Sequence, residues 1–243
     1  MRESLKRIEH EVVACTRCPR LVAYRCRIAQ EKRRAYRDWE YWGRPVPGFG
    51  DPQARLLVIG LAPAAHGGNR TGRVFTGDSS GDLLYDTLYR TGFANQPQSV
   101  SRHDGLRLQG AYITAAARCA PPGNKPLPEE FRNCREYLER EIDLLQEVKV
   151  VVALGKIAFD TYLSILRERG LIASRARKNP RHKERAVATP RAAFRFAHGA
   201  IYKLPPPLPI LIACYHPSRQ NTQTGKLTRE MFLDVFRKAA STS

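Results

Sequence analysis

The sequence has no apolar run long enough to span a membrane as a helix, which excludes an integral membrane protein of the helical type. Its first residues, MRESLKRIEHEVVAC, lack the apolar core of a signal peptide, so we expect a protein that is not secreted. Acidic residues are also scarce, because 23 Asp and Glu face 41 Lys and Arg, for a formal net charge of +18. An excess of this size favours contact with a polyanion over a merely solvated basic surface.

The composition is that of a folded chain, since 42% of the residues are hydrophobic and 26% are charged. A length of 243 residues suffices for one large α/β domain or two small ones. A core of that size needs no cross-links. We expect one domain spanning residues 1–243.

Four short apolar runs that do not alternate with polar residues predict buried parallel strands. They cover residues 55–61, 111–117, 148–154 and 209–215. Helical periodicity lies between and after them, over 80–91, 129–146, 156–168 and 228–240. This alternation predicts an α/β sandwich with a central parallel sheet. Ligands of such folds bind beyond the carboxyl ends of the strands, where this sequence places Pro, Gly, His and Asn.

Two segments are unusually basic. Residues 1–50 form an irregular N-terminal region, in which a helix begins near Leu5 and a basic helix is expected over 21–42. Residues 175–195, within a longer loop or insertion over 175–200, hold eight Lys or Arg and one Glu. The Arg-rich stretch at 17–44 and the basic loop at 175–195 are candidate phosphate contacts, and a solvated run of charge is the alternative for each.

Four of the six cysteines are spaced like metal ligands. Cys15 and Cys18 form a C-x2-C pair, and Cys119 and Cys134 flank a proline-rich loop after the second strand. Four thiolates in two groups can bind zinc or an iron–sulfur cluster. The alternative is that Cys119 and Cys134 are small core residues. Cys26 and Cys214 lack near partners, and Cys214 is expected to pack inside the last strand.

The motifs together resemble the family 5 uracil-DNA glycosylases. Residues 60–78, GLAPAAHGGNRTGRVFTGD, are similar to the long first motif of that family. His216-Pro217-Ser218 resembles the second motif of the wider superfamily, and the segment from Tyr112 to Pro122, with the GNK that follows it, fits the middle segment. The resemblance runs from Cys15 to about Asn221.

The resemblance implies a three-layer α/β/α fold around a four-stranded parallel sheet, with a [4Fe–4S] cluster on Cys15, Cys18, Cys119 and Cys134. It implies hydrolytic removal of a damaged base from DNA, which leaves an abasic site. The expected partner is double-stranded DNA containing damaged bases, with single-stranded DNA an open alternative and a sliding clamp or another repair protein a candidate for the basic loop. We expect a monomer that binds no membrane and lies in the cytoplasm with the nucleoid.

The resemblance also assigns a pocket. Phe75 stands where the family has its stacking aromatic residue, and a core phenylalanine is the alternative. Small residues of the first motif let backbone amides approach a flipped base. The candidate base-binding residues are Gly60, Ala62, Pro63, Ala64, His66 and Phe75, and the candidate DNA contacts are Arg73, Ser218 and Arg219.

Three residues are candidate catalytic groups. Asp78 is the one acid in the first motif, and it could stabilise a developing sugar cation or orient water. A helix N-cap is its alternative, because an apolar helix follows. His216 could donate a hydrogen bond to the base as negative charge builds. Asn124 could recognise the base edge, and a turn residue is its alternative. Since no lysine is placed as a Schiff-base nucleophile, we expect a monofunctional enzyme.

The sequence departs from related patterns at the pocket. Uracil-specific relatives carry a polar side chain in the first motif, where this chain has Leu61, Ala62, Ala64 and Ala65. A sister iron–sulfur family has Asn where this chain has Ala115. These losses imply a less exacting pocket that accepts uracil and other deaminated or oxidised bases, including hypoxanthine and xanthine.

Two other functions fit parts of the sequence. A non-catalytic, zinc-stabilised nucleic-acid-binding module explains the charge and the cysteines, but not the small-residue loop or the HPS segment. A nucleotide-binding α/β enzyme that uses GGNRTG is the other, although that loop lacks the spacing and the Lys-Ser/Thr ending of a P-loop.

Overall fold

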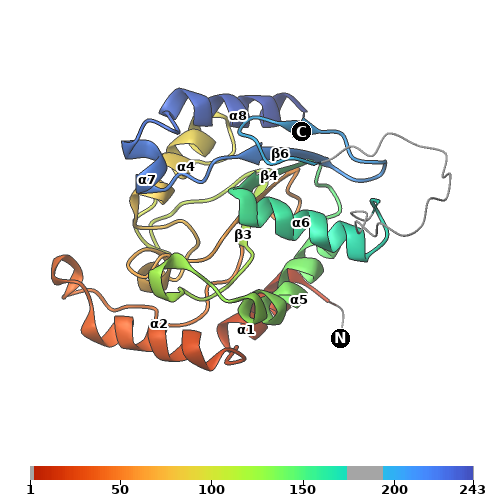
Figure 1. The fold of residues 1–243 in the computed structure, drawn as a ribbon. Coiled ribbons are helices and arrows are strands. Elements are labelled where there is room, and N and C mark those ends of the chain that lie inside the picture. Colours follow the sequence, from red (N-terminus) through yellow and green to blue (C-terminus); the bar gives the residue numbers. More distant parts are fainter. Residues whose placement is uncertain (1–2, 174–193, 243) are drawn as a thin grey trace.

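A single mixed sheet forms the centre of the chain (Figure 1). The computed structural model describes residues 3–173 and 194–242. The strands are β1 (Phe49–Gly50), β2 (Leu56–Gly60), β3 (Ala111–Ala115), β4 (Val150–Leu154), β5 (Ile201–Tyr202) and β6 (Ile210–Cys214). The helices are α1 (Leu5–Val13), α2 (Pro19–Glu31), α3 (Gly68–Thr71), α4 (Ser79–Arg90), α5 (Pro128–Leu144), α6 (Lys156–Glu168), α7 (Arg219–Gln223) and α8 (Arg229–Thr242), with short 3-10 segments at η1 (Arg34–Tyr36) and η2 (Pro122–Asn124).

The strand order is β1-β3-β2-β4-β6-β5. The four inner strands are parallel, as the sequence predicts, while β1 and β5 pair antiparallel at the two edges. The expected four-stranded sheet is therefore the inner part of a six-stranded one. Each edge strand has two residues, which is too short to leave a pattern in the sequence.

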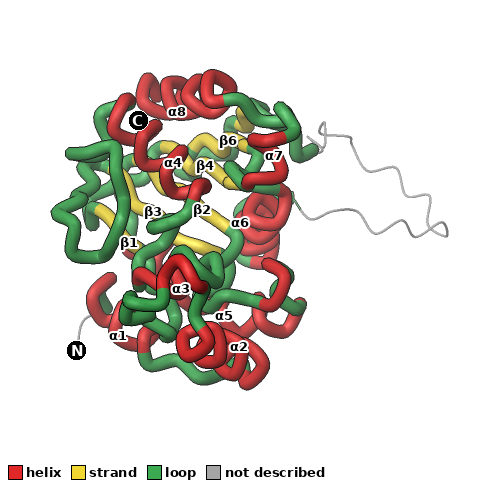
Figure 2. Tube along the Cα trace, turned by 90° about the vertical axis from the view of Figure 1, so that its left-hand side faces the viewer, coloured by secondary structure: helices red, strands yellow, loops and turns green. Residues whose placement is uncertain are grey.

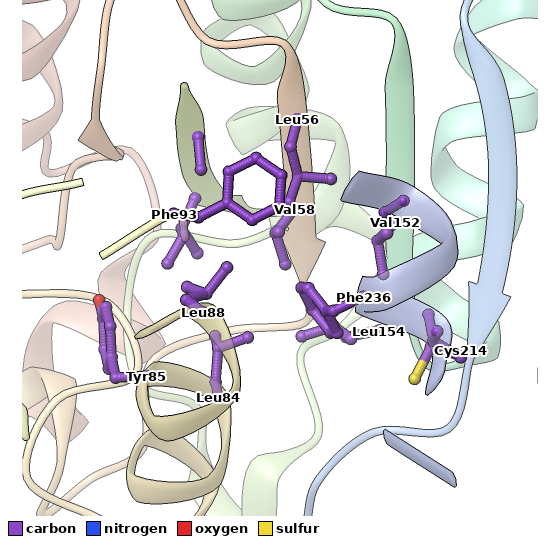
Figure 3. Close-up of a cluster of buried hydrophobic side chains, with 14 of the residues drawn as sticks. Leu56, Val58, Leu84, Tyr85, Leu88, Phe93, Val152, Leu154, Cys214 and Phe236 are labelled. Atoms are coloured by element: carbon purple, nitrogen blue, oxygen red, sulfur yellow. The ribbon is translucent and has the colours of Figure 1, made fainter. Parts of the chain in front are cut away.

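Two layers of helices cover the sheet, which confirms the predicted sandwich. On one face, side chains of β2 and β4 pack against α4 and α8, through residues such as Val58, Leu88 and Phe236 (Figure 3). Cys214 belongs to this core and is fully buried. On the other face, α5 and α6 pack through Leu138 and Phe159. Because both faces are covered, every residue of β2, β3 and β4 is buried.

The N-terminal region differs from its prediction. The basic helix α2 ends at Glu31 rather than near residue 42, because Lys32 adopts a left-handed backbone with φ of 52°. Residues 33–44, which we call the strap, then run across the first-motif loop as an irregular segment that contains η1. Helix α1 packs on α5 through Ile8 and Val12. The strap therefore joins the two N-terminal helices to the body of the sheet.

No helix in the described part of the chain is long and apolar enough to cross a membrane. Most of the predicted basic loop at 175–195 lies outside the described residues, so its expected role in DNA contact stays a prediction.

Candidate active site

The carboxyl ends of the inner strands meet at one edge of the sheet, which faces the viewer in Figure 2. A cavity of about 550 Å³ opens there between the residues that follow β2, β4 and β6. Its lining consists of Leu61, Leu154, Gly155, Lys156, Ile157, Phe196, Tyr215, His216, Asn221 and Lys226. Apolar walls with a few polar groups are typical of a site for a small ligand or a flipped base.

His216 lies in this lining, two residues after β6. Burial lowers the pKa of its imidazole to about 4, so the ring is neutral at pH 7. The Asn221 side chain donates to the His216 carbonyl oxygen over 2.8 Å, and Ser218 accepts from the Asn221 backbone N–H over 3.3 Å as the N-cap of α7. The short helix α7 thus fixes the backbone of His216. The neutral imidazole of His216 can donate one N–H.

The ring of Phe75 lies 5.8 Å from that of His216, between centroids, at an interplanar angle of 31°. Its backbone is left-handed, with φ of 50°, which is costly for an aromatic residue. Gly60 makes room for the ring, because a Cβ added there would lie 2.7 Å from Phe75 Cε2. The structure thus brings Gly60, Phe75 and His216 together beside the cavity.

Asp78 is the N-cap of α4, so the alternative reading of this residue is confirmed. Its Oδ1 accepts from the backbone N–H groups of Ser80 and Gly81, over 2.9 and 3.1 Å. Its Oδ2 faces Gly67, where an added Cβ would collide with it. Burial raises the pKa of the carboxyl above its ordinary value, against the opposing effect of the two N–H donors. Asp78 Oδ1 thus caps the helix, and Oδ2 lies against Gly67 of the first-motif loop.

Arg70 ties the strap to this loop. Its guanidinium carbon lies 3.9 Å from the ring centroid of Tyr36 and 4.1 Å from that of Trp39. Its Nε donates to the His66 carbonyl over 2.8 Å, and one terminal nitrogen donates to the Gly77 carbonyl over 2.8 Å. These two carbonyls bracket the segment that carries Phe75. Arg70 therefore helps to fix the conformation of the first-motif loop.

His66 takes part in the same junction. Its Nδ1 lies 3.0 Å from the Tyr41 hydroxyl, and burial together with Arg33 and Arg70 lowers the pKa of its ring. His66 is absent from the cavity lining, so the structure gives it a place in the strap contact rather than in the pocket. Pro63 is buried against Gly68, and the Ala64 carbonyl accepts from the Gly67 and Asn69 N–H groups.

The four predicted metal-ligating cysteines come together from three parts of the chain. Cys18 and Cys119 pack in one buried cluster with Leu21. Burial raises the pKa of the Cys119 thiol to about 12, Arg25 lowers it, and Cys134, Cys15 and Cys18 raise it further. Such mutual effects arise only between groups that lie near one another. All six cysteines are free of disulfides.

Nitrogen donors lie beside these thiols. Within residues 3–173 and 194–242, no three His, Cys, Asp or Glu side chains are placed to coordinate one metal ion. Arg25, which is 5% exposed, leaves its Nε buried without a partner beside these cysteines, and the Asn133 amide donates to Cys18 Sγ over 3.4 Å. Buried donors of this kind stabilise clusters that carry negative charge.

Comparison with known proteins places this architecture in a family. The model of the uracil DNA glycosylase superfamily matches residues 47–240. A type-5 uracil-DNA glycosylase of Thermus thermophilus is 51% identical over 228 residues, which cover 94% of this chain and 93% of the relative. The chain belongs to the type-5 uracil-DNA glycosylases.

Other relatives agree with this assignment. A type-5 uracil-DNA glycosylase of Pyrobaculum aerophilum is 43% identical, over 96% of this chain and 90% of the relative. A type-4 uracil-DNA glycosylase of Sulfurisphaera tokodaii is 29% identical over 63% of this chain. The resemblance drawn from the sequence motifs is confirmed, and with it the class of enzyme, a hydrolase of N-glycosyl bonds.

The structure argues against one predicted DNA contact, Arg73. Arg73 is 4% exposed, and its guanidinium pairs with Asp104 at 2.6 Å while donating to Thr76 and Ser99. It braces the first-motif loop from inside and is too deeply buried to reach a phosphate. Arg219 is exposed and bonds to Ser79 over 3.2 Å, so it stays a candidate for DNA contact.

Asn124 lies apart from the cavity. It ends the 3-10 segment η2 on the surface, with a left-handed φ of 57°, and is absent from the cavity lining. The backbone of Asn124 is that of a turn residue, and its role in base recognition stays a prediction. Sequence reasoning did not single out Asn221, Tyr215 or Lys226 for the site, although all three line the cavity. Tyr215 directly follows the last inner strand, which was the available signal, whereas Asn221 and Lys226 lie farther along the chain, within and after α7.

We expect Arg70→Lys to lower the excision rate by about 10- to 10²-fold, because a displaced loop misplaces Phe75 and Asp78. Lysine keeps the charge but lacks the planar fork with which arginine bonds two carbonyls at once. Single-turnover kinetics and thermal melting measure the effect. Arg90→Lys, on exposed α4 surface and paired with Asp86, is the control and should match the wild type. Equal rates in both variants would show that the clamp has no part in shaping the loop.

Proposed function

We propose that this chain excises uracil from DNA by hydrolysing the bond between base and sugar, leaving an abasic site. The observation that carries the proposal is the convergence of Phe75 and His216 at the carboxyl edge of the sheet, next to the cavity. The target nucleotide would leave the duplex and enter the pocket, where Phe75 offers an aromatic face to the base.

His216 and Asp78 would share the chemistry. Cleavage builds positive charge on the sugar and negative charge on the leaving base. The neutral His216 ring can donate its N–H to a base carbonyl as that negative charge grows. The Asp78 carboxylate, aimed by its two backbone donors, can stabilise the sugar cation or orient the attacking water.

We extend the proposed substrate range to hypoxanthine, xanthine and other deaminated or oxidised bases. The cavity walls at Leu61, Leu154 and Ile157 are apolar and demand no particular hydrogen-bond pattern from a base. The middle strand, β3, ends at Ala115, which has no side-chain amide with which to select uracil. Discrimination by hydrogen bonding needs buried polar groups that a wrong substrate leaves unpaired, and these positions have none to offer.

Oligonucleotide duplexes with one uracil or one hypoxanthine test the function directly. Incubation followed by alkali should nick the strand at each lesion, and an undamaged duplex should stay intact. Without alkali no nick should form, since we propose a monofunctional enzyme. Tight DNA binding with no nick at any lesion would favour a non-catalytic, metal-stabilised nucleic-acid-binding module.

We also propose that Cys15, Cys18, Cys119 and Cys134 hold a [4Fe–4S] cluster. When bound, the cluster would cross-link the turn before α2 to the end of β3 and to α5. Its role would be structural, because it would fix the helices that lead into the strap. Cytoplasmic location with the nucleoid, a monomeric state and a sliding-clamp partner stay predictions.

Cys119→Ser should abolish the brown colour of the anaerobically purified protein and lower its iron content from about four per chain. Serine is a poor ligand for iron, and three thiolates hold a cluster less well than four. Iron, sulfide and zinc analysis together with thermal melting measure the result. Cys26→Ser is the control, because Cys26 lies outside the group of four, and it should keep the colour. A zinc-only wild type, or a coloured Cys119→Ser, would refute the assignment.

A further inference from the structure

A second cavity, of about 810 Å³, lies next to the first-motif loop and shares no lining residue with the first. It opens between α1, the start of α2, the strap and the loop that carries Arg102. Its lining consists of Glu9, His10, Val13, Ala14, Cys15, Thr16, Arg25, Cys26, Trp42, Gly43, Arg44 and Arg102. Three arginines and one glutamate make this groove basic. Cys15 and Arg25 belong to the proposed cluster site, but Arg44 and Arg102 have no role in the proposed chemistry.

The groove is joined directly to the active-site loop through Trp42. The Trp42 N–H donates to the Arg70 carbonyl over 2.9 Å, and the neighbouring Gly43 N–H donates to the Asn69 carbonyl over 3.0 Å. The Trp42 ring packs so closely on Gly72 that a Cβ added there would lie 2.9 Å from it. The indole N–H is fixed as well, on the Pro45 carbonyl at 3.0 Å. Trp42 is therefore a rigid platform at the border of the loop and the groove.

Two exposed arginines converge on this platform. The guanidinium carbon of Arg102 lies 4.4 Å from the Trp42 ring centroid, and that of Arg44 lies 5.7 Å from it. Neither forms an ion pair with an acidic side chain anywhere in residues 3–173 or 194–242. Two cations that share one aromatic ring without a counter-charge repel each other, so the site gains free energy from a bound anion. Both side chains are exposed, so N–H groups of each guanidinium can reach a ligand.

Arg25 adds charge but few free donors. It is 5% exposed and donates to the carbonyls of Gly43 and Cys15. Glu9, in the middle of α1, is the opposing charge in the lining of the groove. Direct contact with an anion therefore falls to Arg44 and Arg102, at the end of the groove that adjoins the first-motif loop.

We infer that the Trp42 platform, with Arg44 and Arg102, binds the phosphate backbone of DNA beside the flipped nucleotide. The inference rests on the proposed function and names a contact that positions the duplex. Arginine forks match phosphate oxygens in pairs, and a stacked guanidinium loses little further freedom on binding. The groove is open and continuous with the loop, as a backbone that passes the active site requires. The overall charge of +18 provides the same attraction over a longer range.

The test is the salt dependence of DNA binding by Arg44→Gln/Arg102→Gln. Each lost phosphate contact should flatten the slope of log K against log salt by about 1, so the double variant should lose about 2. Affinity should fall equally for uracil-containing and undamaged duplexes, since backbone contacts carry no sequence information.

The matched control is Arg237→Gln/Lys238→Gln on α8, which removes two charges from the opposite side of the molecule (Figure 1). Its slope should stay within error of the wild type, and thermal melting should show both double variants folded. An unchanged slope in the groove variant, or an equal change in the control, overturns the inference. The inference also fails if the wild type binds inorganic phosphate in the groove but the salt dependence of its DNA binding is the same with and without the two arginines.

The two proposals fail separately. If the wild type nicks uracil duplexes and the groove variant keeps its slope, the groove inference fails and the glycosylase proposal stands. If the wild type nicks no lesion, the glycosylase proposal fails, and the slope of the two variants on undamaged duplex still decides whether the groove binds DNA.

Discussion

Replacing Asp78 with asparagine should lower the rate of uracil excision by about 10²- to 10⁴-fold while leaving the fold almost unchanged. Asparagine caps helices as well as aspartate does, so the bonds to the Ser80 and Gly81 N–H groups can persist. What disappears is the negative charge, which the proposed chemistry needs near the sugar. The substitution therefore separates the two roles that the structure combines in one side chain. Single-turnover excision and thermal unfolding are the two measurements.

The pH dependence of the wild type gives an independent check on Asp78. Burial raises the pKa of this carboxyl above 3.8, and the proposed chemistry uses its ionised form. The rate should therefore fall as the pH drops through that raised pKa, and the Asp78→Asn variant should lack this limb. His216 titrates near pH 4, so His216→Gln identifies any contribution from the ring.

Asp82 provides the control for these experiments. It lies in the first turn of the same helix, is exposed, and bonds to neither of the two N–H groups. Asp82→Asn should excise uracil at a rate close to that of the wild type. A wild-type rate in Asp78→Asn would remove this carboxylate from the mechanism and leave it as a cap.

The largest loss of stability should follow from Glu141→Gln, at about 3 to 5 kcal/mol in the free energy of unfolding. Glu141 and Arg118 are each 1% exposed, and Glu141 Oε2 accepts from Arg118 and from Thr114, both at 2.5 Å. Removing the carboxylate charge leaves a buried guanidinium without its counter-ion. Two Arg118 nitrogens already lack a partner, so nothing nearby can compensate.

This pair also braces the cysteine region, because Arg118 precedes Cys119 and Glu141 lies two turns after Cys134 on α5. Glu141→Gln should therefore weaken retention of the proposed cluster as well as the fold. Urea unfolding and iron content measure the two effects. Glu136→Gln, on the same helix and in an exposed pair with Arg17, should cost no more than about 1 kcal/mol. Equal losses in the two variants would refute a special role for the buried pair.

The inner sheet was predictable because parallel strands covered on both faces need nearly continuous apolar runs, and four such runs stand out. The helices of the body followed from their periodicity. The end of α2 was not predictable, because Lys32 carries no sequence signal for its left-handed backbone. A basic run that continues past residue 31 resembles a longer helix when only spacing is considered.

The candidate site shows a similar division. Residues that lie within a recognisable motif, such as Phe75 in the first motif, could be named from the motif alone. Arg73 could not be judged, because its partner Asp104 lies 31 positions away and no local pattern connects them. For Asp78 the sequence offered a cap and a catalytic carboxylate as competing interpretations. The structure shows that the two are compatible, since one oxygen makes the cap.

The strap gives this protein a built-in optical reporter. Its two tryptophans, Trp39 and Trp42, both lie in this segment. One stacks on the Arg70 guanidinium and the other packs on Gly72, so each indole touches the first-motif loop. Selective excitation of tryptophan therefore records the docking of the strap on that loop, without a label and without signal from the rest of the chain. If the proposed cluster is present, a shift in tryptophan emission during its removal would measure how fast a change at the cysteines reaches the first-motif loop.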